Sequence, residues 1–175
     1  MKKYLHIVVL LLTAACTPHI QPPQPAFSQV DSVYTEADIR TYGDYYNSGH
    51  QVYAVDLLSN GLDYDSAGYI IGSGCNLYLS DIFVRKDDSI CLPVGTYHMD
   101  STAQNMTFLR GMYFEDNITG TYLLEIKENQ IQRITLFYGG KMTIDYEDGD
   151  TIFDFHLYTK DSVLYHATYH GYASQ

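Results

Sequence analysis

The sequence has 175 residues, a formal net charge of −11 at pH 7, and 18 tyrosines but no tryptophan. This length is enough for one domain with a sizeable core. The acidity argues against nucleic acid and anionic lipid head groups as partners, because both require basic patches on the protein.

The amino terminus has the three parts of an export signal. Two lysines precede an apolar run over residues 7–12, and Ala14 and Ala15 stand directly before Cys16. The run is shorter than the ~20 apolar residues that a membrane span needs. The cysteine after small residues resembles the bacterial lipobox, in which the thiol receives a diacylglycerol before cleavage. We expect residues 1–15 to be a lipoprotein signal peptide and Cys16 to carry lipid; an ordinary secretory signal is the alternative.

Proline dominates the segment after the expected cleavage site. Four of the five prolines of the chain fall within residues 17–25. Proline favours extended geometry and provides no amide hydrogen for a sheet. We therefore interpret residues 16–30 as a lipid-anchored tether and residues 31–175 as an all-β domain.

The domain sequence favours strands. Glycine and Asp/Asn residues recur about every eight to twelve residues, which is the spacing of turns in β-sandwiches and barrels. Residues 32–42 are the one segment whose spacing favours a short helix. Alternating apolar residues predict strands over residues 51–58, 75–84, 95–99, 105–114, 120–126, 130–138, 141–146, 151–158 and 163–172.

Turn residues separate several of these strands and predict three tight turns and one strand break. The turns are at Glu128-Asn129, Asp148-Gly149 and residues 160–162, and the break is at Gly139-Gly140. Short turns between consecutive strands imply antiparallel neighbours. We predict a single antiparallel β-sandwich or flattened barrel of about 8–10 strands with mostly meander connections. The pattern leaves sandwich and closed barrel open.

The two cysteines of the domain are expected to be free. If residues 75–84 and 89–98 form a hairpin, Cys91 lies opposite about Ile82, too far from Cys75 for a disulfide. Exported proteins can form disulfides, so a bridge is the alternative to two buried thiols.

Four short motifs of turn and aromatic residues occur along the domain. They are Tyr42-Gly43-Asp44-Tyr45-Tyr46, Asn60-Gly61-Leu62-Asp63, Leu92-Pro93-Val94-Gly95-Thr96-Tyr97 and Tyr169-His170-Gly171-Tyr172. In this order they resemble the small all-β lipoproteins that gut Bacteroidales encode in large numbers, over most of residues 38–172. The resemblance implies a domain anchored in the cell envelope, at the outer membrane, without an assigned activity, and it carries over no catalytic residues. Residues 17–20 lack the acidic residues frequent in surface-exported lipoproteins, so periplasm and cell surface both stay open.

Histidines on the last expected strand do not predict a metal site by themselves. His166 and His170 share a face, but four residues along a strand separate them by about 13 Å. A site would require His156 or His98 from a neighbouring strand. We interpret the histidines as part of a solvated face and expect no metal and no cofactor.

Catalytic motifs are absent from the sequence. The carboxylates of residues 145–150 and of residues 63–65 fit polar turns and do not follow the twelve-residue calcium loop. The sequence contains no G-x-S-x-G motif, phosphate loop or dinucleotide fingerprint. A glycosidase needs two carboxylates about 5–10 Å apart, and the sequence does not identify such a pair. We therefore expect no catalytic residues.

Tyr42, Tyr45 and Tyr46 form a dense aromatic cluster and are the expected ligand contacts. Tyrosine combines a flat apolar face with a hydroxyl, which suits stacking on sugars and protein interfaces, although most tyrosines of a β domain serve strands and core. The sequence favours a non-catalytic envelope lipoprotein, attached to the membrane by its lipid, that binds a glycan, a small molecule or an envelope protein. A lipocalin-like carrier of an apolar molecule and a structural subunit of an envelope assembly are the alternatives.

Overall fold

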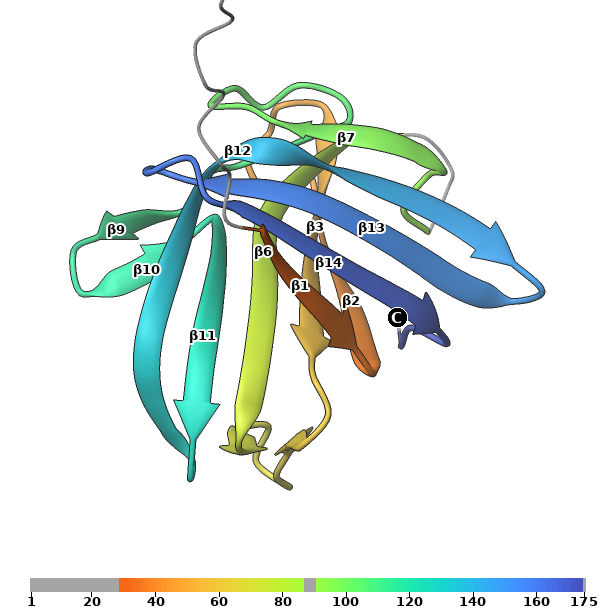
Figure 1. The fold of residues 1–175 in the computed structure, drawn as a ribbon. Coiled ribbons are helices and arrows are strands. Elements are labelled where there is room, and N and C mark those ends of the chain that lie inside the picture. Colours follow the sequence, from red (N-terminus) through yellow and green to blue (C-terminus); the bar gives the residue numbers. More distant parts are fainter. Residues whose placement is uncertain (1–28, 87–90, 175) are drawn as a thin grey trace, which may run out of the picture.

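The computed structural model describes residues 29–86 and 91–174 (Figure 1). The expected signal peptide, Cys16 and residues 17–28 of the expected tether lie outside the described residues. Fourteen strands and no helix form in the described part of the chain, which confirms the all-β prediction. Correspondingly, none of the described residues belongs to a helix long and apolar enough to cross a membrane.

The strands of the first half of the chain are β1 (Gln29–Tyr34), β2 (Glu36–Gly43), β3 (His50–Leu58), β4 (Leu62–Tyr64), β5 (Ile70–Gly72), β6 (Gly74–Arg85) and β7 (Gly95–Met99). Those of the second half are β8 (Thr107–Phe108), β9 (Met112–Phe114), β10 (Asn117–Thr119), β11 (Thr121–Lys127), β12 (Gln130–Glu147), β13 (Asp150–Thr159) and β14 (Leu164–Gly171).

Ten strands form one curled sheet in the order β1-β14-β13-β12-β7-β8-β6-β3-β2, with β11 paired to both β12 and β6. Because β7 and β8 also connect β12 to β6, the strands β6, β11, β12, β7 and β8 close a small barrel region. The hairpins β4–β5 and β9–β10 form two separate small sheets. The expected meander is present in β2–β3 and in β11–β12–β13–β14, whereas β1 and β14 pair in parallel.

The long strand β12 shows that the predicted break at Gly139-Gly140 is wrong. Its first part pairs with β11, and its second part pairs with β13 and β7. The register shifts between Phe137 and Gly139, and Gly140 has a φ of +135°, so the strand bends here without ending. A Cβ on Gly140 would lie 2.2 Å from the carbonyl oxygen of His156. Glycine is therefore required for this bend and for the close approach of β13.

Two further sequence expectations are wrong. Residues 32–42 form strands, because β1 pairs with β14 and β2 pairs with β3, and pairing within the sheet overrides a weak helical pattern. The expected hairpin of residues 75–84 with 89–98 does not form: β6 pairs with β3 and β11, and β7 pairs with β12 and β8. No disulfide joins Cys75 and Cys91, as expected, although both residues are half-buried rather than buried.

Two of the predicted tight turns are formed by backbone in the left-handed region. Glu128 and Asn129 have φ of 52° and 64°, and Asp148 and Gly149 have φ of 53° and 94°. Positive φ at both central residues is the mark of the primed turns that match the twist of two-residue hairpins. These turns set the register of β11–β12 and β12–β13.

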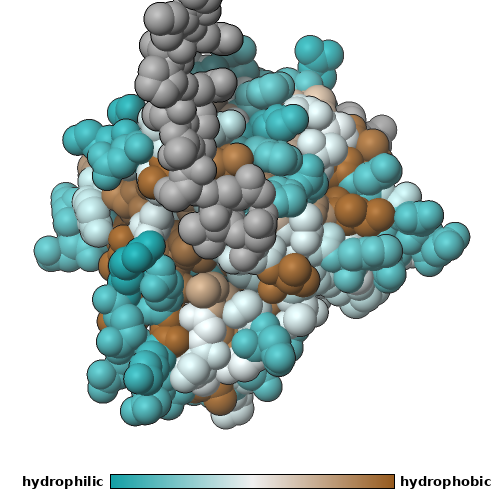
Figure 2. Space-filling view, in the orientation of Figure 1, coloured by the Kyte–Doolittle hydropathy of each residue, from teal (hydrophilic) through white to brown (hydrophobic). Residues whose placement is uncertain are grey.

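Large side chains fill the space enclosed by the curled sheet. The expected inward positions of β3 (Tyr53, Val55) and of β13 (Phe153, Phe155, Leu157) are buried there. Rings from other strands complete the core, namely Tyr34, Phe108, Phe137, Tyr97, Tyr165 and Tyr169. The side of the molecule shown in Figure 2 is mostly hydrophilic or of neutral hydropathy, with smaller hydrophobic areas between. Because side chains fill the enclosed space, the candidate sites lie on the outer faces of the sheet.

Candidate functional site

The outer face of β2, β3 and β6 carries a group of polar and aromatic side chains. Alternation along β2 buries Ala37 and Ile39 and directs Asp38, Arg40 and Tyr42 outward. Across the sheet, Asp38 is the register partner of Asp56 on β3, which is in turn the partner of Tyr78 on β6. Two neighbouring pockets lie on this face, one aromatic and one built around ion pairs.

The first pocket, here named the aromatic groove, has a volume of about 260 Å³ and is lined by Tyr42, Tyr45, Val52, Tyr78, Ser80 and Asp81. This is slightly below the ~300–1,000 Å³ typical of small-molecule pockets. Three tyrosine rings and one carboxylate therefore surround a space suited to one small ring.

Two β-bulges aim side chains into the aromatic groove. The β2–β3 register shifts between Thr41 and Gly43, so Tyr42 is the extra residue of one bulge. Between β3 and β6, the register shifts where Ser80 and Asp81 stand opposite one residue of β3. Asp81 has a φ of 56°, a conformation that Asp tolerates better than most residues. Bulges commonly re-aim side chains beside binding sites, and here two of them serve one groove.

The loop between β2 and β3 is held rigid by its own aspartate. The Asp44 carboxylate accepts hydrogen bonds from the backbone N–H groups of Ser48 (2.8 Å) and Gly49 (3.1 Å). Tyr46 stacks at a tilt on Phe83 of β6, with ring centroids 5.8 Å apart, and the Tyr45 ring meets Tyr46 edge to face at 5.0 Å. The exposed Tyr45 ring is thus fixed before any ligand arrives, which reduces the entropy lost on binding.

The Asp81 carboxylate is oriented by two hydroxyl donors. The Tyr46 hydroxyl donates to Oδ1 at 2.6 Å, and the Ser80 hydroxyl donates to Oδ2 at 2.7 Å. Burial, followed by the bond to Asp81, raises the pKa of Tyr46 to about 12, so this hydroxyl remains a donor at neutral pH. A carboxylate oxygen has more than one lone pair, so Asp81 can also accept a hydrogen bond from a ligand hydroxyl in the groove.

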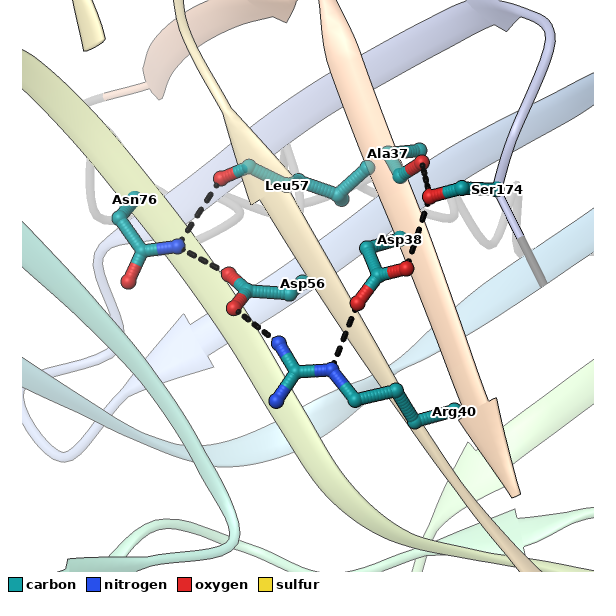
Figure 3. Close-up of polar contacts among 7 residues, drawn as sticks. All are labelled: Ala37, Asp38, Arg40, Asp56, Leu57, Asn76 and Ser174. Atoms are coloured by element: carbon teal, nitrogen blue, oxygen red, sulfur yellow. Dashed lines mark hydrogen bonds and ion pairs between the residues drawn. The ribbon is translucent and has the colours of Figure 1, made fainter. Parts of the chain in front are cut away.

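The second pocket, here named the ion-pair pocket, has a volume of about 410 Å³ and includes Asp38, Arg40, Asp56 and Ser174 in its lining. The Arg40 guanidinium donates from Nε to Asp38 Oδ2 at 2.6 Å and from Nη2 to Asp56 Oδ2 at 2.9 Å (Figure 3). Asn76 donates to Asp56 Oδ1, and the Ser174 hydroxyl donates to Asp38 Oδ1 at 2.7 Å. The network joins β2, β3, β6 and the segment after β14.

Asp56 is the buried member of this network, with 6% of its surface exposed. Burial raises the pKa of its carboxyl above the ordinary value of 3.8, although contacts with Tyr64, Asn76 and Arg40 oppose the shift. Both carboxylate oxygens already accept hydrogen bonds from Arg40 and Asn76. The Tyr64 hydroxyl is buried close by without a hydrogen bond of good geometry. The carboxylate is thus held in an internal ion pair.

The structure brings the three predicted contact residues together at one place. Tyr42, Tyr45 and Tyr46 are 48%, 69% and 49% exposed, and the first two line the aromatic groove while Tyr46 supports it. Sequence reasoning missed Tyr78 and the network around Arg40. The signal for Asp81 was present, since it interrupts the apolar alternation of β6.

The histidines occupy the outer face of the other part of the sheet. His166 on β14 stands directly opposite His156 on β13, one of the two alternative neighbours that the sequence indicates for a metal site. His98 on β7 is separated from His156 by Lys141 of β12. His170 lies further along β14, opposite Ile152.

Comparison with known proteins gives no match: no protein-family model, no curated protein and no solved structure is significantly similar to this chain. Function must therefore be inferred from the geometry of the sites, since a fold by itself does not define one.

Proposed function

We propose that this chain is a non-catalytic lipoprotein of the cell envelope that binds a saccharide in the aromatic groove, with lipid on Cys16 as its membrane attachment. The observation that carries the proposal is the convergence of Tyr42, Tyr45 and Tyr78 with Ser80 and Asp81 around one open pocket. A sugar presents C–H groups on its ring faces and hydroxyls at its edge. Tyrosine faces suit the first, and an oriented carboxylate suits the second.

The charge around the groove favours a neutral or amino sugar. Asp81 lines the groove itself, and Asp38 and Asp56 lie on the same face with Arg40 between them. Two carboxylates against one guanidinium, added to Asp81, leave the face net negative. An anionic saccharide would be repelled, whereas a neutral or positively charged one would not.

The two rival functions receive less support from the geometry. An apolar carrier needs an enclosed cavity, and the interior here is filled by large side chains. A glycosidase needs two carboxylates directed at the substrate, whereas Asp38 and Asp56 are both engaged by Arg40. A structural subunit of an envelope assembly is a further alternative, and cross-linking in intact cells would reveal its neighbours.

The test is ligand-induced stabilisation of the full-length chain in detergent. Thermal melting is followed by far-UV circular dichroism against neutral, amino and acidic saccharides. At a hundredfold excess over the dissociation constant, a ligand stabilises the folded state by about 2.7 kcal/mol. For a chain of this size that corresponds to a rise in melting temperature of about 5–10 °C.

Tyr45→Ala provides the site-specific variant, and Tyr172→Ala is the matched control, because Tyr172 is also highly exposed but lies outside the groove. We expect Tyr45→Ala to weaken saccharide binding at least about tenfold and Tyr172→Ala to leave it unchanged. A flat response to the whole panel, or equal losses in both variants, contradicts saccharide binding here. Turnover of any saccharide contradicts the non-catalytic part of the proposal.

A further inference from the structure

A histidine and carboxylate cluster lies on the outer face of β13 and β14, which run side by side in Figure 1. The imidazole rings of His156 and His166 stack with centroids 4.7 Å apart and planes 26° apart. Asp154 lies two residues before His156 on the same face of β13. Its Oδ2 is 3.1 Å from Nε2 of His156, and its Oδ1 is 2.8 Å from Nε2 of His166.

We propose that Asp154, His156 and His166 form a binding site for a divalent transition-metal ion such as Zn²⁺. One ligand atom from each residue lies within 4.8 Å of the other two. Ligands around a tetrahedral zinc ion at bonds of about 2.0–2.1 Å are about 3.3 Å apart. Because the three ligand atoms already lie within 4.8 Å of one another, a relative movement of about 1.5 Å or less brings each pair to that separation.

The donor set selects the class of metal. Neutral imidazole nitrogen favours zinc, copper, nickel and iron, whereas calcium and magnesium prefer a shell of oxygen ligands. Two imidazoles and one carboxylate supply three ligands, which leaves a fourth tetrahedral position for water or for an incoming group. The three residues are half-buried, so an ion has access from solvent while the side chains keep a defined geometry.

The sheet holds the three donors in place. His156 and His166 are direct register partners on neighbouring antiparallel strands, and such side chains have Cβ atoms about 4.5–5.5 Å apart. Their neighbours in sequence, Phe155 directly before His156 and Ala167 directly after His166, are fully buried in the core. Because the inward residues anchor both strands, the outward donors belong to a rigid element rather than to a loop.

The charged groups around the cluster both favour and oppose an ion. Asp154 supplies the carboxylate, and Asp150 lies on the same strand beside His170, 3.5 Å from its Nε2. Lys141 is the register partner of His156 on β12, and its ammonium opposes a nearby cation. We therefore expect moderate affinity, with a dissociation constant of Zn²⁺ in the micromolar range.

Isothermal titration of the full-length chain with ZnCl₂, in detergent and without an affinity tag, tests the proposal. We expect one Zn²⁺ per chain and at least about a tenfold loss of affinity in His156→Gln and in His166→Gln. His170→Gln is the matched control, since it removes an exposed imidazole from the same face of β14. Its affinity should stay within about twofold of the wild-type value.

Substitution with Co²⁺ supplies an independent measurement on the wild-type chain, so that the conclusion does not depend on how the variants fold. A tetrahedral nitrogen and oxygen environment gives intense d–d absorption, whereas hydrated or octahedral Co²⁺ gives weak bands. Absence of zinc binding, an octahedral Co²⁺ spectrum, or zinc affinity that His156→Gln and His166→Gln leave unchanged would overturn the site. Equal loss in His170→Gln would also overturn it by showing diffuse surface binding.

Discussion

Alanine substitution at the two adjacent glycines of β12, Gly139 and Gly140, is expected to have opposite effects on stability. Gly140 has a φ of +135°, and an added Cβ would lie 2.2 Å from the carbonyl oxygen of His156 on β13. Gly139 has nothing within 4 Å of the same added atom. Alanine at position 140 should therefore be strongly destabilising, and alanine at position 139 should be tolerated.

The expected loss in Gly140→Ala has two parts. A non-glycine residue held at such a φ costs about 1–3 kcal/mol. Relief of the clash requires a shift of the β13 backbone in a packed region, which costs about 1–3 kcal/mol more. We expect the free energy of unfolding to fall by about 3 kcal/mol or more in Gly140→Ala and to change by less than about 1 kcal/mol in Gly139→Ala.

Urea denaturation measures this difference, with tyrosine fluorescence and far-UV circular dichroism as probes because the chain lacks tryptophan. With a denaturant slope of about 2 kcal/mol/M, a loss of 3 kcal/mol lowers the midpoint by about 1.5 M. Similar midpoints for Gly139→Ala and Gly140→Ala would refute the proposed bend. If Gly139→Ala were destabilised and Gly140→Ala unchanged, the requirement for glycine would lie at position 139 and the assignment to Gly140 would be wrong.

Three further predictions concern buried polar groups and the histidine cluster. The hydroxyls of Tyr34 and Tyr165 are 2.6 Å apart in the core, and Ser32 also forms a hydrogen bond with Tyr165. Tyr165→Phe leaves the Tyr34 hydroxyl unpaired, so urea denaturation should show that the free energy of unfolding falls by about 1–3 kcal/mol. The fall should be smaller in Tyr34→Phe, because Tyr165 keeps its bond with Ser32. Because the folded pKa of Asp56 lies above 3.8, the folded state binds more protons than the unfolded state in the window between the two values, so stability falls as pH rises through it. The stability of wild type relative to Asp56→Asn should therefore decline from pH 3.8 upward, and an increase instead would show that Arg40 dominates. Lys141→Gln should tighten Zn²⁺ binding in a calorimetric titration, whereas weaker binding would place the lysine in a supporting role.

Alternation and turn chemistry carried most of the fold prediction. Residues 151–158 alternate in burial because one face of the strand meets the core, and their inward residues are buried as expected. In residues 51–58 the expected inward Tyr53, Val55 and Leu57 are buried, but so are the residues between them. Asn129 and Asp148-Gly149 indicate their turns because Asn, Asp and Gly adopt positive φ more readily than other residues. These are local properties, so a single sequence contains them.

The errors arose where the outcome depends on distant partners. The sequence Gly139-Gly140 predicts a break, but whether a strand bends or ends there depends on β11, β13 and β7, which pair with its two parts. Cys91 was placed opposite residue 82 in a hairpin that does not form, because β6 already has β3 and β11 as neighbours. Pairing across long sequence separations has no local signature.

Only the part of the candidate site that is local in sequence could be predicted, for the same reason. Tyr42, Tyr45 and Tyr46 are clustered in sequence, and a rigid loop keeps them clustered in space. Tyr78 and Asp81 join them only through the register of β3 with β6. Likewise the sequence names His156 and His98 as alternative neighbours of His166, and only the register of β13 with β14 identifies His156 as the one that stands opposite it.

The dual pairing of β12 has a consequence for how the domain can be changed. The first half of β12 pairs with β11 and the second half pairs with β13. The strand therefore links the part of the sheet that carries the groove to the part that carries the histidines, and the two parts cannot be separated at any point along it. The domain is therefore not modular, and neither binding face can be transplanted as a fragment with its own complete sheet. The β2–β3 loop, by contrast, is closed by Asp44 within six residues, and its Tyr46 contacts Asp81 and Phe83 of β6. Exchange of that loop is the smallest graft that could alter ligand choice without rebuilding the scaffold.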